Sequence, residues 1–353
     1  MTIDELLRTA CENKASDLHL KVGNYPYIRV DGELRPLSQF SRVSSEDMLN
    51  MAFSIMTNRQ KQKFKENTEL DMAYGVAGLG RFRVNVFQQR GNVGMVLRVI
   101  PTKIRTLEEL YLPKVLDKIC EEQRGIVLVT GTTGSGKSTT LAAMVDRINS
   151  ARTDHIITIE DPIEFLHRDK KACINQREVG IDTHSFANSL KHVMRQNPDI
   201  ILVGEMRDLE TISLAITAAE TGHLVMATLH TADAAQTVDR IIDVFPPGQQ
   251  QQVRLQLSTT LQAIFSQTLL PRADGTGRIV AYEVLLCTPA IRSMIREGKT
   301  HQLYSAIQSG AKFGMITLDN CLKDLCLKGL VTVEEAIAKS SNPHEFEKMM
   351  MRG

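Results

Sequence analysis

The chain has 353 residues, 42% of them hydrophobic and 24% charged, and its 42 Lys plus Arg nearly balance 41 Asp plus Glu to a net charge of +1. This composition supplies apolar side chains for packed cores, excludes a disordered chain, and at this length indicates about two domains. The near-neutral charge disfavours a chain-wide basic field for nucleic acid, and no apolar run reaches the roughly 18 residues that a membrane span requires.

The first hundred residues are expected to form a small α+β domain. Thr2 and Glu5 fit a capping box for a helix over about residues 3–13, and this acidic start also disfavours a secretory signal, so a cytoplasmic protein is expected. Hydrophobic patterning and an Asp31-Gly32 turn signal predict strands over residues 18–22, 27–30, 33–37, 81–87 and 94–100.

One of these strands alternates strictly. Phe82, Val84 and Val86 would lie on one face of the sheet, while Arg81, Arg83 and Asn85 would lie on the other, and Arg98 belongs to the next strand. The first domain is therefore expected to carry an arginine-bearing sheet face.

A change of pattern divides the chain. Residues 101–113 place Pro101 and Pro113 around a short helical piece, so they are expected to link a domain of residues 1–100 to one of residues 114–353. In the second domain, short apolar runs at residues 126–130, 156–159, 200–203 and 224–228 alternate with helix-like segments, which predicts a doubly wound, mostly parallel α/β sheet. From about residue 246 onward the pattern is mostly helical, apart from a hairpin around residues 272–277.

Residues 131–138 read GTTGSGKS, which fits GxxxxGK[ST] directly between an apolar strand and a helix. In such a loop the backbone N–H groups and the helix N-terminus bind phosphate, while Lys137 neutralises phosphate oxygens as an exposed electrostatic ligand and Ser138 reaches Mg²⁺. The expected nucleotide-binding residues are Gly131, Thr133, Gly134, Ser135, Gly136, Lys137, Ser138 and Thr139.

Polar residues follow three of the other predicted strands. Glu160, Asp161 and Glu164 follow residues 156–159, Glu205 follows residues 200–203, and His230 follows residues 224–228. Taken singly, such residues are more often caps, turns or surface side chains. Downstream of a phosphate loop they favour metal binding and water activation, because ligands bind at the carboxyl ends of parallel strands.

These motifs, in this order, resemble the secretion ATPases of type II secretion and type IV pilus systems. GTTGSGKST is similar to their Walker A motif, EDPIE to their Asp box, RQNPDIILVGEMRD to their variant Walker B motif, and TGHLVMATLHT to their His box. The resemblance covers the whole chain, and it implies a RecA-like P-loop ATPase domain preceded by a smaller PAS-like domain.

The resemblance also implies roles, and ATP with Mg²⁺ as cofactors. Glu164 would be the general base, Glu205 would act on Mg²⁺ or its waters together with Ser138, and His230 would sense the γ-phosphate. From the first domain, Arg83 and Arg98, with Arg81 as a third, would reach the nucleotide.

Within the family, the closest resemblance is to the pilus retraction ATPases. The chain starts directly with the PAS-like domain, LLPRADGTGR replaces a four-cysteine zinc loop, and residues 290–299 (AIRSMIREGK) are similar to the AIRxxIREGK motif of retraction members. On spacing alone, residues 290–299 would be a surface helix with Arg292, Arg296 and Lys299 outward. The implied protein is a homohexameric motor for pilus retraction and twitching motility, docked at the cytoplasmic face of the inner membrane through a platform protein.

Three other functions remain open at this point. The first is a pilus assembly or type II secretion ATPase of the same family. The second is a RecA-like nucleic-acid translocase, which the neutral charge and the lack of an aromatic-basic stretch disfavour, so no nucleic-acid partner is expected. The third is a regulator that binds ATP without turnover, which the two intact carboxylate positions disfavour.

Overall fold

The computed structural model describes residues 1–30, 32–101 and 103–351. The chain divides into two compact units, Met1–Lys103 and Ile104–Gly353, each of which is described by itself. Leu107, inside the segment expected to link two domains, is buried in a hydrophobic cluster of the second unit. No described helix is long and apolar enough to cross a membrane.

The first unit packs three helices against a six-stranded sheet with the order β3-β2-β1-β6-β5-β4. The helix α1 begins with the predicted capping box of Thr2 and Glu5. The turn predicted at Asp31-Gly32 falls between β2 and β3, and Asp31 lies outside the described residues. The elements are α1 (Ile3–Glu12), β1 (Asp17–Lys21), β2 (Tyr27–Val30), β3 (Glu33–Pro36), α2 (Ser45–Ser54), α3 (Asn58–Asn67), β4 (Glu69–Val76), β5 (Gly80–Gln89) and β6 (Asn92–Ile100).

The alternation in β5 is as predicted, because Phe82, Val84 and Val86 are fully buried. Arg83 stands directly opposite Arg98 in the antiparallel pairing of β5 with β6. The helices α2 and α3 and the strand β4 were not predicted from the sequence. In α3 the physical reason is visible, since Phe64 is its one buried residue and the apolar periodicity is correspondingly weak.

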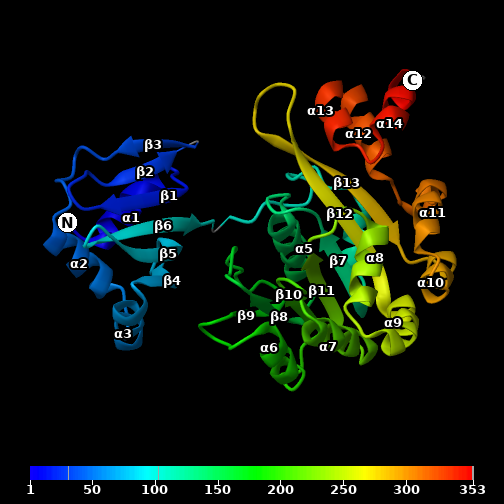
Figure 1. Ribbon diagram of the computed structural model, residues 1–353, viewed down its shortest axis with the longest axis horizontal. Coiled ribbons are helices and arrows are strands. Elements are labelled where there is room, and N and C mark those ends of the chain that lie inside the picture. The colour runs from blue at the N-terminus through cyan, green and yellow to red at the C-terminus, as the bar shows by residue number, and fades with distance from the viewer. Residues whose placement is uncertain (31, 102, 352–353) are drawn as a thin grey trace. The chain divides into compact units, whose positions relative to one another are not determined.

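The second unit is built on a seven-stranded sheet with the order β13-β12-β7-β11-β10-β8-β9, parallel except for β13 (Figure 1). The predicted fold class, a mostly parallel α/β sheet, is confirmed. The strands are β7 (Gly125–Thr130), β8 (His155–Glu160), β9 (Cys173–Glu178), β10 (Ile200–Val203), β11 (Leu224–Leu229), β12 (Leu261–Pro271) and β13 (Arg278–Leu286).

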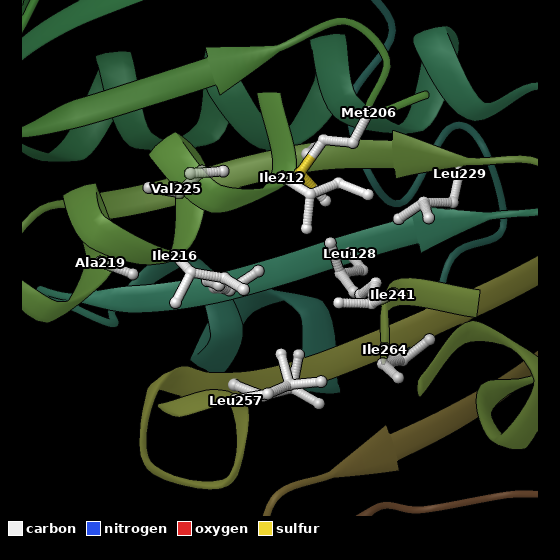
Figure 2. Packing of buried hydrophobic residues seen from close by; sticks show 14 of the residues in the cluster. Leu128, Met206, Ile212, Ile216, Ala219, Val225, Leu229, Ile241, Leu257 and Ile264 are labelled. Carbon is white, nitrogen blue, oxygen red and sulfur yellow. The ribbon is translucent and has the colours of Figure 1, made fainter. Parts of the chain in front are cut away.

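Helices cover both faces of this sheet, as a doubly wound fold requires. On one face, Leu128, Val225 and Ile264 of the strands pack with side chains of α7, α8 and α9 (Figure 2). On the other, α4 and α5 pack on β7, β10 and β11. The helices are α4 (Val115–Cys120), α5 (Lys137–Ala151), α6 (Phe186–Val193), α7 (Leu209–Glu220), α8 (Ala234–Asp243), α9 (Pro247–Thr260), α10 (Pro289–Arg296), α11 (Leu303–Ser309), α12 (Leu318–Leu327), α13 (Val333–Lys339) and α14 (Pro343–Met351), with short 3₁₀ turns η1 (Thr300–Gln302) and η2 (Ala311–Phe313).

The expectation of a mostly helical chain after residue 246 is wrong in one respect. The predicted hairpin is present, but its strands β12 and β13 run the length of the sheet and take up residues that were expected to be helical. Both strands are buried over most of their length, and a continuous apolar run cannot be distinguished from a buried helix by periodicity. The strand β9 was also missed, because its sequence CINQRE is polar.

Candidate functional site

A cavity of about 520 Å³ lies at the carboxyl ends of β8, β10 and β11. Most of the predicted nucleotide and catalytic residues of the second unit line it, namely Thr133, Gly134, Gly136, Lys137, Ser138, Thr139, Glu164, Glu205 and His230. Gly131 and Ser135 are buried and are not among the lining residues. Residues separated by almost a hundred positions thus meet in one site.

The loop from β7 to α5 has the conformation that phosphate binding needs. Gly131, Gly134 and Gly136 have φ angles of 143°, 79° and 89°, values that other residues rarely adopt. Gly136 is the N-cap of α5, and no side chain caps that helix end. The backbone N–H groups of the first turn are consequently available to an anion, and the helix dipole favours negative charge there.

Lys137 is not the exposed ligand that the sequence predicts. The residue is only 8% exposed, and its Nζ donates hydrogen bonds to the carbonyl oxygens of Gly131 (2.8 Å) and Thr132 (3.0 Å). Burial lowers the pKa of Lys137, while the charges of Glu205 and Glu164 act in the opposite direction. The ammonium group of Lys137 therefore also stabilises the conformation of the loop that contains it. The sequence motif does not reveal this contact.

Glu205 is held by two basic side chains. Arg207 donates to both carboxylate oxygens, and His230 Nε2 lies 3.2 Å from Oε1. Burial would raise the pKa of Glu205, but the hydrogen bond from Arg207 and the nearby His230 bring the net pKa below its usual value. The loop is anchored by the next residue, Met206, which is buried beside Ile212 (Figure 2).

The Asp box contributes two glutamates with different environments. Glu164 is exposed and lines the cavity. Glu160 also lines it, accepts hydrogen bonds from Thr158 Oγ1 (2.7 Å) and Gln176 Nε2 (3.1 Å), and has its pKa raised by burial. Two carboxylates, of which that of Glu164 is exposed, thus line the same cavity.

The cavity lining contains oxygen donors of the kind that Mg²⁺ prefers. Ser138 and Glu205 both line the cavity with oxygen atoms. Mg²⁺ is typically held by one or two such protein ligands, the substrate phosphates and several waters. The residues present fit this ion, and no cluster of three or more His, Cys, Asp or Glu that could hold a metal occurs among the described residues.

Several cavity residues were missed by sequence reasoning. Leu269 and Arg278 reach the cavity from the β12–β13 hairpin, and Arg207 reaches it from the loop after β10. Leu269 and Arg278 lie more than a hundred residues from the phosphate loop, at the two ends of the segment LLPRADGTGR, for which no role in the site was predicted. Only the pairing of β12 with β7 brings them there.

The arginines predicted to act from the first unit lie on its sheet. Arg98 donates from Nε to Asp17 Oδ1 at 2.9 Å, and Asp17 is buried. Asp17 also lies 3.9 Å from Arg29 Nε. Arg83 stands opposite Arg98 on the neighbouring strand. The structure therefore gives Arg98 a local partner that the sequence does not indicate.

Residues 290–299 form α10 and the turn that follows it. Ile291 and Ile295 are buried. The expectation that Arg292 points outward is wrong, because its guanidinium donates to Ser258 O (2.8 Å), Thr259 O (2.9 Å) and Gln262 Oε1 (2.8 Å). Carbonyl oxygens at the end of a helix lack intrahelical partners, so Arg292 caps the C-terminus of α9.

Residues 1–276 match the protein family described as Type II/IV secretion system protein. The "Type IV pilus retractation ATPase PilT" of Pseudomonas aeruginosa is 51% identical over 346 residues, 98% of this chain and 100% of that protein. The "Type IV pilus ATPase PilU" of the same organism is 43% identical over 100% of this chain and 92% of that protein.

Among solved structures, the pilus retraction motor PilT with bound ADP superimposes with a TM-score of 0.93 and 49% identity, over 99% of this chain and 100% of that one. The resemblance drawn from the four motifs is confirmed by these matches. Because the family match covers more than two thirds of the chain and the relatives cover nearly all of it, the chain belongs to the Type II/IV secretion system protein family.

Proposed function

We propose that this protein is a Mg²⁺-dependent ATPase that powers retraction of type IV pili and so drives twitching motility. The single observation that carries the proposal is the shared cavity, in which the phosphate loop, Glu205 and His230 meet. The direction of the work, retraction, is supported by 51% identity to PilT over nearly the full length of both chains.

Different residues of this chain would bind the phosphates, hold Mg²⁺ and accept a proton from water. The loop of residues 131–138 binds the phosphates through backbone N–H groups and Lys137. Ser138 and Glu205 would hold Mg²⁺, which supplies charge neutralisation on the phosphate oxygens when bound. Glu164 accepts a proton from the attacking water, and His230 joins Glu205 to the loop near the position of the γ-phosphate.

The first unit would contribute arginines to the reaction. Arg83 and Arg98, with Arg81 as a third, would stabilise charge on the phosphates, as arginine fingers do in other P-loop enzymes. For Arg98 this requires leaving Asp17. The proposed moving parts are a domain of residues 1–100, a linker of residues 101–113 and an ATPase domain of residues 114–353.

The proposed assembly is a homohexamer. It would bind a platform protein and so lie at the cytoplasmic face of the inner membrane. Support for these partners comes from the family resemblance alone. A pilus assembly ATPase remains the second candidate, favoured by the 43% identity to a relative named only as a type IV pilus ATPase.

Deletion of the gene tests the proposal. Cells without the protein should carry excess surface pili and lose twitching, and wild-type protein should restore both, whereas a Lys137→Ala variant should not. Bald cells would instead assign the protein to pilus assembly. ATP hydrolysis by the purified protein that rises on adding DNA, and falls again with salt, would favour the translocase.

A further inference from the structure

Gln267 of β12 contacts the phosphate loop at Ser135, which lies 132 residues earlier in the sequence. The residue is 5% exposed. Its Nε2 donates to Ser135 O at 2.6 Å in a buried hydrogen bond, and its Oε1 accepts from Thr140 Oγ1 at 2.7 Å. One amide thus joins the loop to the first turn of α5, and neither the sequence motifs nor the comparisons assign it a role.

The orientation of this amide is determined by its partners. A carbonyl oxygen can only accept, so the atom facing Ser135 O must be the NH₂ group of Gln267. The other end then has to be the oxygen, and the Thr140 hydroxyl supplies the matching donor. Because the site is buried, water cannot replace either partner if one is lost.

The contact controls a peptide group that faces the nucleotide. In a planar trans peptide, the C=O of one residue and the N–H of the next point in opposite directions. Gln267 draws Ser135 O toward β12, which directs the N–H of Gly136 away from β12. Gly136 lines the cavity and caps α5. The hydrogen bond from Gln267 thus fixes the orientation of a peptide group at the cavity, where an N–H can bind an anion.

The backbone of the same residue shapes the start of the loop. A Cβ atom on Gly131 would lie 2.2 Å from Gln267 O, so no side chain fits there. Ser266, one residue earlier, accepts a hydrogen bond from Thr130 Oγ1 at 2.8 Å. The parallel pairing of Ser266 with Thr130 brings Gln267 O close to Gly131 and Ser266 Oγ close to Thr130 Oγ1. The strand β12 thus contacts the phosphate loop near both of its ends.

We propose that Gln267 is a positioning residue for phosphate binding: it holds the Ser135–Gly136 peptide with its N–H toward the phosphates and thereby sets the affinity for nucleotide. This inference rests on the proposed function, since it requires that the cavity binds a nucleotide. It adds a residue, and a strand, to the phosphate site that the GxxxxGK[ST] motif defines.

The test uses Gln267→Glu in the full chain. An ionised carboxylate cannot donate to Ser135 O, whereas a protonated carboxyl group can. Burial raises the pKa of such a carboxyl group, so protonation is accessible at mildly acidic pH. The dissociation constant of Mg-ADP should rise about tenfold at pH 8, equivalent to roughly 1.4 kcal/mol for a lost buried hydrogen bond, and recover toward the wild-type value at pH 5.5.

Gln262→Glu is the matched control. Gln262 lies on the same strand but bonds Arg124 O and Arg292 instead of the phosphate loop. Its substitution should change Mg-ADP binding by less than about twofold at either pH, within the effect expected of a surface change. Calorimetry at both pH values, with wild-type protein as reference, gives the ratios.

A second pair of variants, at Thr140, tests the inference even if Gln267→Glu does not fold. Thr140→Val removes the donor to Gln267 Oε1 and should weaken Mg-ADP binding, whereas Thr140→Ser keeps the hydroxyl and should bind as the wild type does. Wild-type affinity in Gln267→Glu at pH 8, a loss that does not respond to pH, or equal binding by the two Thr140 variants would each overturn the inference while leaving the ATPase proposal intact. Wild-type protein that binds no Mg-ADP would overturn both.

Discussion

His230 bridges two parts of the candidate site: its Nε2 lies 3.2 Å from Glu205 Oε1, and its Nδ1 lies 3.4 Å from Thr133 Oγ1. The imidazole therefore touches both the phosphate loop and the acidic residue after β10. Both partners also line the cavity, so a single side chain connects these two parts of its lining. A ring with two distinct nitrogens suits this position, since each nitrogen can serve a different partner.

Removing that bridge should slow turnover more than it weakens binding. His230→Ala is expected to lower kcat about tenfold, the effect of losing one hydrogen bond of roughly 1.4 kcal/mol in the transition state, with KM for ATP nearly unchanged. Steady-state kinetics of the purified protein measures both quantities. His223→Ala, at the start of β11 and absent from the cavity lining, is the control. A raised KM with unchanged kcat would mean that His230 serves ground-state binding.

Substitutions of the two glutamates of the Asp box, Glu160 and Glu164, should affect turnover to different degrees. Glu164→Gln is expected to bind Mg-ATP normally and to lower kcat by about 10²-fold or more, because an amide cannot accept a proton from water. Glu160→Gln keeps its hydrogen-bond acceptor toward Thr158 and should retain more activity. Single-turnover hydrolysis compares the variants. If Glu160→Gln alone stops turnover, the buried carboxylate is the base.

Glu283 should make the stability of the protein depend on pH. The residue is 4% exposed, and burial, with smaller contributions from Asp233 and Asp319, raises its pKa from 4.5 to about 7 despite a hydrogen bond from Ala234 N. Since the folded pKa exceeds the unfolded one, the fold prefers the neutral form. This contribution to stability is complete below pH 4.5 and is lost as pH rises to about 7.

Glu283→Gln removes this ionisation. Relative to wild type, the variant should gain stability as the pH rises from 5 to 8, by up to about 3 kcal/mol for a shift of this size. Melting curves across this range measure the difference, and Glu121→Gln, at an exposed position after α4, serves as control. A constant difference in melting temperature at all pH values would show that Glu283 does not titrate there.

The surface of α10 should matter for pilus retraction and not for hydrolysis. Arg292 is excluded from this role because it caps α9, whereas the side chains of Arg296 and Lys299 contact Ser293 and Glu297 of their own segment. Reversing both charges, Arg296→Glu with Lys299→Glu, should leave ATP hydrolysis within about twofold, as for most surface changes, and abolish twitching in complemented cells.

Lys328→Glu with Lys339→Glu, an equal charge reversal at exposed positions beyond α12 and in α13, is the control for the α10 variant. It should leave twitching unchanged. Parallel loss of hydrolysis and twitching in the α10 variant would place Arg296 and Lys299 in the fold or in the ATP cycle, and normal twitching would remove them from the retraction mechanism.

The parts of the site that could be predicted from the sequence are short segments whose functional residues are close together in the sequence. The loop of residues 131–138 and the polar residues after β8, β10 and β11 are such segments. Gln267, Leu269 and Arg278 could not be found in this way, because their place in the site depends on the pairing of β12 with β7. Burial is likewise a property of the whole fold, which explains why the environment of Lys137 was not predicted.

The strand β12 is held at two points by side-chain amides. Gln262 near its start is bonded to Arg292 of α10, and Gln267 is bonded to the phosphate loop. A paired strand advances about 3.3 Å per residue and does not stretch. The helix α10 and the loop of residues 131–138 are therefore connected in series through this strand, so a pull along the strand would be transmitted to the peptide group of Ser135 and Gly136.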